Sequence, residues 1–243
     1  MQVGSADIVR RGAVRAPALN RREQNKQDKL QRILGAARAL FRAKDFAAVT
    51  TQEIAQAADI AAGTLFLYVT SKEDLLVLVF KDEMVAVARK AFAGVDRGLP
   101  LAGQLLLCFN SMKSYHARDL ALSRVLLKEL TVLSNTARRA DIAALMRVIY
   151  GGITHLLLAA QQAGALGAKL DVRTAAQALF AGYYVGLIGW LGGAHSAAQY
   201  ERHLRRQIDL ILGGAHRVTV VPKAKRRSAA IDAAPRARKT VRS

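Results

Sequence analysis

One short stretch, residues 50–72 of the 243-residue chain, carries side chains suited to bind a nucleic acid. Hydroxyl and ammonium groups that could hold phosphates occur at Thr51, Tyr68 and Lys72. Small residues that would let a backbone approach base edges closely occur at Ala62, Gly63 and Thr64. A threonine hydroxyl can bond several bases, and apolar side chains can contact the methyl group of thymine. The chemistry that this stretch predicts is therefore recognition of DNA.

The rest of the chain offers few groups at the spacing that catalysis or metal binding needs. His116 and Asp119 lie one helical turn apart, with Cys108 two turns earlier, so a metal site and a solvated helix end both remain open. Cys108 lies in an apolar run, where a small core residue is the alternative to a nucleophile. No acid–base pair has convincing spacing. We expect no catalytic residue, no metal and no cofactor, with a helical enzyme or carrier as a rival class.

A helix–turn–helix is the arrangement that would position the DNA-binding groups. Thr50 and Glu53 form a capping box that starts a short helix, predicted over 51–58. A turn over 59–61 separates it from a second short helix over 62–68. Such a second helix enters the major groove while the first lies over the DNA backbone. The candidate DNA-binding residues are Thr50, Thr51, Ala62, Gly63, Thr64, Phe66, Leu67, Tyr68 and Lys72.

The composition is that of an all-α protein. Of all residues, 52% are apolar and only four are proline, and no strand alternation is visible. The single cysteine excludes an intramolecular disulfide, which fits a reducing, cytoplasmic compartment. Further helices are expected over 24–43, 71–93, 101–115, 119–133, 138–163, 172–193 and 197–212.

These elements predict two domains and two tails. The predicted parts are a basic disordered arm (1–23), a helix–turn–helix DNA-binding domain (24–70, with its motif at 50–69), a connecting helix (71–93), a helical ligand-binding and dimerisation domain (94–214) and a basic disordered tail (215–243).

Positive charge is concentrated at the two ends of the chain. The net charge is +19; residues 1–32 hold eight Lys or Arg against three acids, and residues 216–243 hold nine against one. The motif region 33–80 holds four against five. The ends either keep the protein in solution or attract DNA phosphates. We favour phosphate contact for the N-terminal end, which adjoins the motif, and leave both open for the C-terminal end.

The run over 175–194 has no charged residue and is long enough to span a bilayer. Its alanine and glycine content argues against insertion, so a membrane-associated protein is a weaker rival and we expect no membrane partner. Its glycines form one helical stripe, which predicts close approach of another helix. A partner subunit is the favoured neighbour and an internal helix the alternative. The predicted homodimer interface comprises Gly182, Gly186, Gly189 and Gly193 with Leu204 and Ile208 of the last helix.

A small-molecule pocket between the helices of the larger domain is also expected. Aromatic, soft or hydrogen-bonding side chains that could line it are Phe109, Met112, Tyr115, His116, Tyr150, His155, Tyr183, Tyr184 and Trp190. About a third of them should do so, since helical spacing also suits plain core residues. Few charges occur in this set, which favours an apolar ligand, either neutral or mildly anionic.

Three motifs resemble the N-terminal domain of TetR-type transcriptional regulators: ILGAARALF (33–41), TTQEIAQAADIAAGTLFLYV (50–69) and SKEDLL (71–76). The resemblance implies an all-helical homodimer that binds a palindromic operator in double-stranded DNA. It implies a repressor that releases the operator when a small molecule binds the larger domain. It further implies that Thr51, Tyr68 and Lys72 contact phosphates, while Ala62, Gly63, Thr64 and Phe66 face bases.

The chain departs from the family pattern at four positions. The family often has glycine where Asp45 and Asp59 stand, serine where Ala61 stands and tyrosine where Phe66 stands. Ala61 removes a helix cap and a phosphate bond, and Phe66 lacks a hydroxyl. Phosphate attraction must then come largely from residues 1–32.

Overall fold

Helices make up the regular structure of this computed structural model, which describes residues 21–131 and 136–216. The predicted arm up to residue 20 and the tail from residue 217 lie outside the described residues. The elements are α1 (Arg21–Ala43), the 3-10 turn η1 (Phe46–Ala48), α2 (Thr51–Ala57), α3 (Ala62–Leu65), α4 (Lys72–Ala93), α5 (Leu101–Ala117), α6 (Leu120–Thr131), α7 (Thr136–Gln162), α8 (Val172–Leu191) and α9 (Ala197–His216). The all-α prediction is confirmed over the described ranges.

The predicted helices are present, with ends that differ by a few residues. The capping box ahead of α2 is formed in both directions: the Thr50 hydroxyl accepts from the Glu53 backbone N–H, and the Glu53 carboxylate accepts from the Thr50 backbone N–H. The second short helix differs most, because α3 ends at Leu65 and a turn replaces the predicted helix over 66–68. α1 begins at Arg21, three residues before the predicted start.

A small apolar core joins α1, α2 and α3. Its buried members include Ile33, Leu34, Ala37, Phe41, Val49, Ile54, Ala55, Leu65 and Val69. The turn between α2 and α3 passes through Asp59, whose φ of +53° is left-handed. Aspartate tolerates this conformation better than most residues, and glycine tolerates it best. Ala61 precedes α3 without a side-chain cap, as the sequence predicts.

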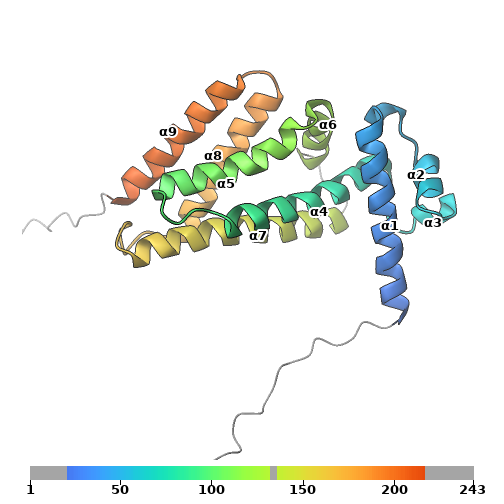
Figure 1. The fold of residues 1–243 in the computed structure, drawn as a ribbon, viewed down its shortest axis with the longest axis horizontal. Helices are drawn as coiled ribbons and strands as arrows, with labels where there is room; N and C mark the ends of the chain where they lie inside the picture. The colour runs from blue at the N-terminus through green and yellow to red at the C-terminus, as the bar shows by residue number, and fades with distance from the viewer. Residues whose placement is uncertain (1–20, 132–135, 217–243) are drawn as a thin grey trace, which may run out of the picture.

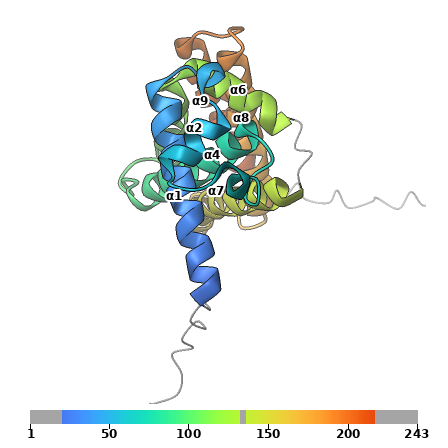
Figure 2. The same cartoon turned by 90° about the vertical axis from the view of Figure 1, so that its right-hand side faces the viewer.

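α4 connects this small domain to the larger one. It passes from the DNA-binding domain into the larger domain alongside α7, and α5, α8 and α9 complete the bundle (Figure 1). Fully buried side chains such as Phe109, Ile153 and Tyr200 fill its interior. Seen from the right-hand side of Figure 1, α1 and α2 lie in front of the bundle, and the first turns of α1 project beyond the rest of the molecule (Figure 2).

The glycine stripe of α8 faces α9 of the same chain. A Cβ at Gly186 would lie 3.2 Å from the Tyr200 ring, and one at Gly182 would lie 2.3 Å from the Gln207 side-chain oxygen. The stripe therefore lets α9 pack closely on α8, which was the alternative to a partner subunit. This corrects the predicted dimer interface, because the following residues serve packing or a turn within the chain: Gly182, Gly186, Gly189 (beside His195), Gly193 (φ +81°), Leu204 and Ile208.

One described helix, Arg138–Gln162 within α7, is long and apolar enough to cross a membrane by length and composition. In the structure it packs against α4, α5 and α8. A helix in the core of a bundle passes the same test, and 28% of the apolar window of this helix is buried within the described chain. The uncharged run over 175–194 packs on α9 in the same way.

Two adjacent glycines of α7 should respond oppositely to alanine. A Cβ at Gly152 would lie 2.3 Å from the Phe92 ring of α4, whereas a Cβ at Gly151 has open space. Gly152→Ala should lower the free energy of unfolding by about 1–3 kcal/mol through overpacking. Gly151→Ala should raise it by roughly 0.5–1 kcal/mol through helix propensity. Urea unfolding of both variants measures the difference, and equal effects would contradict this account of the α4–α7 contact.

Candidate functional site

The surface that the sequence assigns to DNA recognition is exposed at α3 and the turn after it. Ala62 and Gly63 are exposed, Thr64 is half-buried, and the Phe66 and Leu67 side chains are 54% and 80% exposed. A Cβ at Gly63 would meet nothing within 4 Å, so packing within the chain does not require glycine there. Two large apolar side chains and a small helix start are thus free to contact a partner.

The two threonines at the start of α2 differ in their freedom. The Thr50 hydroxyl donates to the Glu53 carboxylate at 3.2 Å and accepts from the Glu53 backbone N–H, so the capping box occupies it. Thr51 is half-buried on the first turn of α2, where its hydroxyl stays available for phosphate. A hydrogen bond from Lys44, followed by the backbone bond from Thr50, lowers the pKa of Glu53 to about 2.

Lys72 has a structural role within the chain. Its Nζ donates to the backbone carbonyls of Phe46 (2.9 Å), Ala47 (3.1 Å) and Val49 (3.0 Å). These bonds use all three donors of the ammonium group. Lys72 therefore connects the start of α4 to the turn before α2, and its phosphate contact stays a prediction.

The other basic residues of the motif region are also occupied within the chain. Arg38 and Arg42 of α1 pair with Glu83 of α4 at 2.8 and 2.6 Å, and Lys44 pairs with Glu53 at 2.6 Å. These pairs hold α1 against α4 and steady the turn before α2. Within the described part of the chain, phosphate attraction must then come from other residues.

A basic hollow beside the recognition surface supplies such residues. It lies between the start of α1 and the turn after α3, and it is lined by Arg21, Arg22, Glu23, Asn25, Lys26, Lys29, Leu67 and Tyr68. The α1 residues are exposed on the projecting helix of Figure 2. Tyr68 is half-buried at the opposite wall, in a place to contact the same phosphates as the lysines. The predicted contribution of the N-terminal segment thus begins within α1.

A buried ion pair joins the recognition segment to the larger domain. Arg138 on the first turns of α7 donates from Nε to the Asp74 carboxylate at 2.6 Å and from a terminal nitrogen to the Tyr68 carbonyl at 3.2 Å. A third bond reaches Asp141 at 2.6 Å. Asp74 also accepts from the Thr70 backbone N–H at 2.9 Å. One guanidinium therefore bonds α7, α4 and the end of the recognition segment.

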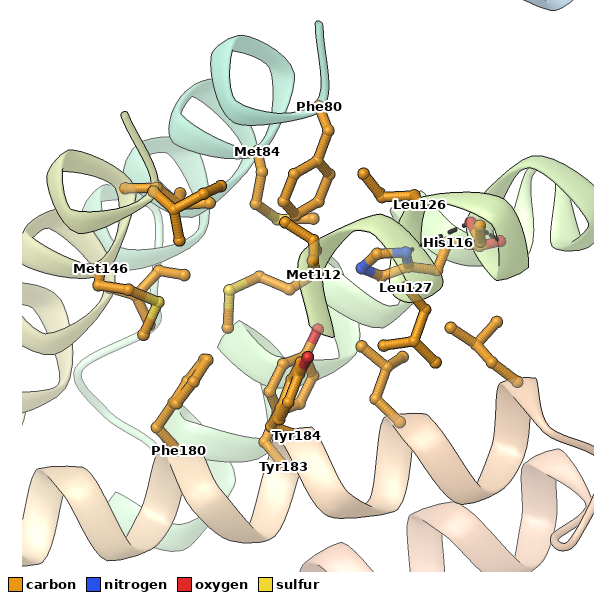
Figure 3. Close-up of a pocket in the computed structure, with 17 residues that line it drawn as sticks. Phe80, Met84, Met112, His116, Leu126, Leu127, Met146, Phe180, Tyr183 and Tyr184 are labelled. Atoms are coloured by element: carbon orange, nitrogen blue, oxygen red, sulfur yellow. Dashed lines mark hydrogen bonds between the residues drawn. The ribbon is translucent and has the colours of Figure 1, made fainter. Parts of the chain in front are cut away.

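The larger domain encloses a cavity of about 240 Å³ between α4, α5, α6, α7 and α8. None of its lining side chains is an acid, a lysine or an arginine. Figure 3 shows rings, sulfur atoms and aliphatic chains pointing into one space. The lining residues are Phe80, Met84, Met112, His116, Ser123, Leu126, Leu127, Leu130, Ile142, Leu145, Met146, Ile149, Phe180, Tyr183, Tyr184, Leu187 and Leu191.

His116 is the most polar group in this cavity. Its Nδ1 lies 3.3 Å from the Ser123 hydroxyl, which itself donates to the His116 carbonyl at 3.1 Å. Burial lowers the pKa of His116 to about 4, so the ring is neutral at pH 7. The metal alternative finds no support in this geometry, because Cys108 bonds to the Ala91 carbonyl and Asp119 caps the Leu122 backbone N–H.

Four of the nine candidate pocket residues line the cavity: Met112, His116, Tyr183 and Tyr184. Phe109 lies behind the wall, stacked on Tyr183 with ring centroids 5.1 Å apart. Trp190 instead covers the buried ammonium of Lys113, 5.2 Å from its ring centroid.

The remaining candidates lie outside the cavity. Tyr150 packs its ring edge-on against Phe180, and His155 is exposed on α7. Tyr115 lines a second hollow beside Glu83, between the two domains. The sequence did not single out the lining residues of α4, α6 and α7. Their apolar helical spacing is the same as that of ordinary core residues, so no signal distinguished them.

Matched substitutions of two lysines separate a structural role from a DNA-binding role. Lys72→Met should lower the free energy of unfolding by about 1–3 kcal/mol, because three carbonyls lose a charged donor. Lys29→Met should leave that free energy within roughly 0.5 kcal/mol of wild type. Lys29→Met should also reduce the slope of log K against log salt for DNA binding by about 0.9 if it loses one phosphate contact.

Urea unfolding and anisotropy titrations on DNA at several salt concentrations measure these effects. The DNA is a palindrome sought beside the coding region. If Lys72→Met were as stable as wild type and had a smaller slope of log K against log salt, Lys72 would be a phosphate ligand and not a structural residue.

Comparison with known proteins agrees with this geometry. The family model for bacterial regulatory proteins of the tetR family matches residues 33–79. The fatty acid metabolism regulator protein of Bacillus subtilis is 27% identical over 157 residues, which are 65% of this chain and 80% of that protein.

Solved structures of regulators share the fold. The transcriptional regulator FadR from Bacillus subtilis, in complex with stearoyl-CoA, has a TM-score of 0.58 at 24% identity, covering 76% of this chain and 99% of that one. FadR from Thermus thermophilus, a TetR family repressor in complex with lauroyl-CoA, has a TM-score of 0.62 at 24% identity, covering 81% and 97%.

The matched family model covers the motif whose recognition surface, capping box and turn are described above, and the neighbours share the helical domain behind it. Regulators of this family bind operator DNA as dimers and respond to small molecules. The chain is thus a TetR-type helix–turn–helix transcriptional regulator, a DNA-binding protein and not an enzyme.

Proposed function

We propose that this regulator represses transcription in the cytoplasm and releases its operator when a fatty-acyl chain enters the cavity of the larger domain. The observation that carries the proposal is the cavity of the larger domain, whose described lining residues include no charged side chain. Apolar ligands gain free energy by leaving water for such a site. The acyl-CoA complexes of two structural neighbours support the same ligand class.

The volume of the cavity limits the length of the acyl chain that it can hold. At about 30 Å³ for each water-sized group, 240 Å³ holds on the order of eight such groups. About eight carbons of a medium acyl chain therefore fit inside the cavity without rearrangement, and any further carbons of the acyl chain would lie at its mouth. A charged head group has no counter-charge in the lining and must remain at the mouth of the cavity.

The route from the cavity to the DNA-binding domain runs through α7. Ile142, Met146 and Ile149 of α7 face the cavity, and Arg138 lies one turn before Ile142. A ligand that displaces α7 displaces the guanidinium that bonds Asp74 and the Tyr68 carbonyl. Ligand and DNA then favour different positions of one element, which is what allosteric coupling requires.

Acyl-CoA titrations into the operator complex test the function. Octanoyl-, decanoyl- and lauroyl-CoA should release fluorescent operator DNA in an anisotropy assay, and coenzyme A alone should not. Met146→Trp should fill the cavity and raise the acyl-CoA concentration needed for release at least about tenfold, while DNA affinity stays unchanged. Failure of every chain length to bind or to release DNA would contradict the proposal.

The same titration tests the route through α7. Arg138→Lys keeps the charge, but an ammonium cannot reproduce the planar fork of a guanidinium. By calorimetry, decanoyl-CoA should bind this variant as tightly as it binds the wild type. The bound ligand should nevertheless lower the DNA affinity of the variant less than it lowers that of the wild type. Full release by Arg138→Lys would place the coupling elsewhere.

The dimer that operator binding requires is proposed to form through the outer faces of α8 and α9. Large apolar side chains are exposed there at Val185 (61%), Ile188 (40%) and Leu210 (77%). Exposed apolar area of this kind favours association. The two helices lie together at the end of the molecule away from α3 (Figure 1).

Charge placed on that face should separate the subunits. Val185→Glu and Leu210→Glu should each shift the light-scattering mass toward the monomer at micromolar concentration. Leu158→Glu, on the 38% exposed Leu158 of α7, is the matched control and should stay dimeric. A monomeric wild type, or dimeric variants with intact operator binding, would contradict this interface.

A further inference from the structure

Three polar atoms inside the apolar cavity have no hydrogen-bond partner among the described residues and point into the same space. They belong to His116, Tyr183 and Tyr184 (Figure 3). His116 and Tyr183 are buried, at 4% and 3% exposure, and Tyr184 is half-buried. Polar groups in such surroundings are normally hydrogen-bonded, so a ligand could supply the hydrogen bond that each of these atoms lacks.

The protonation of His116 can be worked out from its neighbour. The Ser123 hydroxyl has one proton and donates it to the His116 carbonyl at 3.1 Å. Toward Nδ1, 3.3 Å away, the same oxygen can therefore only accept. In this arrangement Nδ1 carries the ring proton, which leaves Nε2 as an acceptor. Nε2 is the ring nitrogen that faces the cavity in Figure 3.

The two phenols supply the complementary donors. The hydroxyls of Tyr183 and Tyr184 extend from α8 into the cavity, and neither bonds to another described residue. Burial first, and then the neighbouring phenols of Tyr200 and Tyr184, raise the pKa of Tyr183 well above its usual value, so it remains a donor. Burial raises the pKa of Tyr184 as well.

A plain alkyl chain satisfies none of these atoms. Water could pair with them in the empty cavity, and a methylene that displaces such water loses those hydrogen bonds. A carbonyl could accept from the phenols but would leave Nε2 unpaired. A hydroxyl does both, because it donates to Nε2 and accepts from a phenol.

From this complementarity we infer that the preferred effector is an apolar chain that carries one hydroxyl group within the cavity, held between His116 Nε2 and the phenols of Tyr183 and Tyr184. The inference rests on the proposed function and narrows its ligand class from acyl chains to hydroxylated acyl chains. The apolar lining binds the chain, and the three polar atoms select the oxidised carbon.

The test compares decanoyl-CoA with decanoyl-CoA thioesters that carry one hydroxyl at different carbons. Isothermal titration calorimetry on the full chain should find at least one isomer that binds about tenfold tighter than decanoyl-CoA, the gain expected from a hydrogen bond to a buried acceptor. His116→Phe and Tyr184→Phe should each remove most of that preference, measured as the ratio of the two dissociation constants within the same variant. Tyr150→Phe is the matched control, since Tyr150 lies outside the cavity, and should keep the full preference.

The outcomes separate the two proposals. If every hydroxylated isomer binds more weakly than decanoyl-CoA to the wild type, the inference is wrong and the acyl-chain function stands. If both His116→Phe and Tyr184→Phe keep the preference for the hydroxylated isomer, the inference is also wrong, because another group would then bind the hydroxyl. If neither decanoyl-CoA nor any isomer binds or releases operator DNA, the proposed function fails as well.

Discussion

The buried ion pair between Arg138 and Asp74 is the contact on which the relation between the two domains depends. Both side chains are largely removed from water, at 10% and 5% exposure, and their atoms lie 2.6 Å apart. Removing one partner of such a pair leaves an uncompensated buried charge, which costs about 3–5 kcal/mol. The Arg138–Asp74 contact therefore fixes the angle of the recognition segment against α7. A shift of α7 would strain this contact, and breaking it would cost much free energy.

The division of charge in the DNA-binding domain follows from its internal contacts. The arginines and lysines of the motif region hold α1, α2 and α4 together, as the pairs of Glu83 and the carbonyl bonds of Lys72 illustrate. Their charge is neutralised or directed inward, so the projecting start of α1 is left to attract phosphates. We propose that affinity and specificity then reside in different segments: the basic helix end would attract any DNA, and α3 with its following turn would contact bases.

The features that could be predicted from the sequence are those that neighbouring residues determine. The features that could not be predicted depend on contacts between distant parts of the chain. The capping box of Thr50 and Glu53 involves neighbours in the chain, so the start of α2 could be predicted to the residue. Lys72 reaches back to carbonyls 23 to 26 residues away, and nothing in its surroundings in the sequence predicts that. The glycines of α8 did predict close helix approach, but only the fold decides whether α9 or a partner approaches. Cavity and core residues share one apolar period, and only the space left by packing distinguishes Met146 from Ile153.

The exposed side chains of Phe66 and Leu67 have a thermodynamic consequence for the search for an operator. A regulator that slides along arbitrary DNA on its basic helix end makes ionic contacts and leaves these two side chains in water. If they enter the groove at the operator, as we propose, they lose their hydration, and burial of apolar surface gives binding a negative heat capacity change. Specific and nonspecific complexes of this protein should therefore differ in how steeply their binding enthalpy changes with temperature, and the contrast between them should fade on cooling as the hydrophobic contribution weakens.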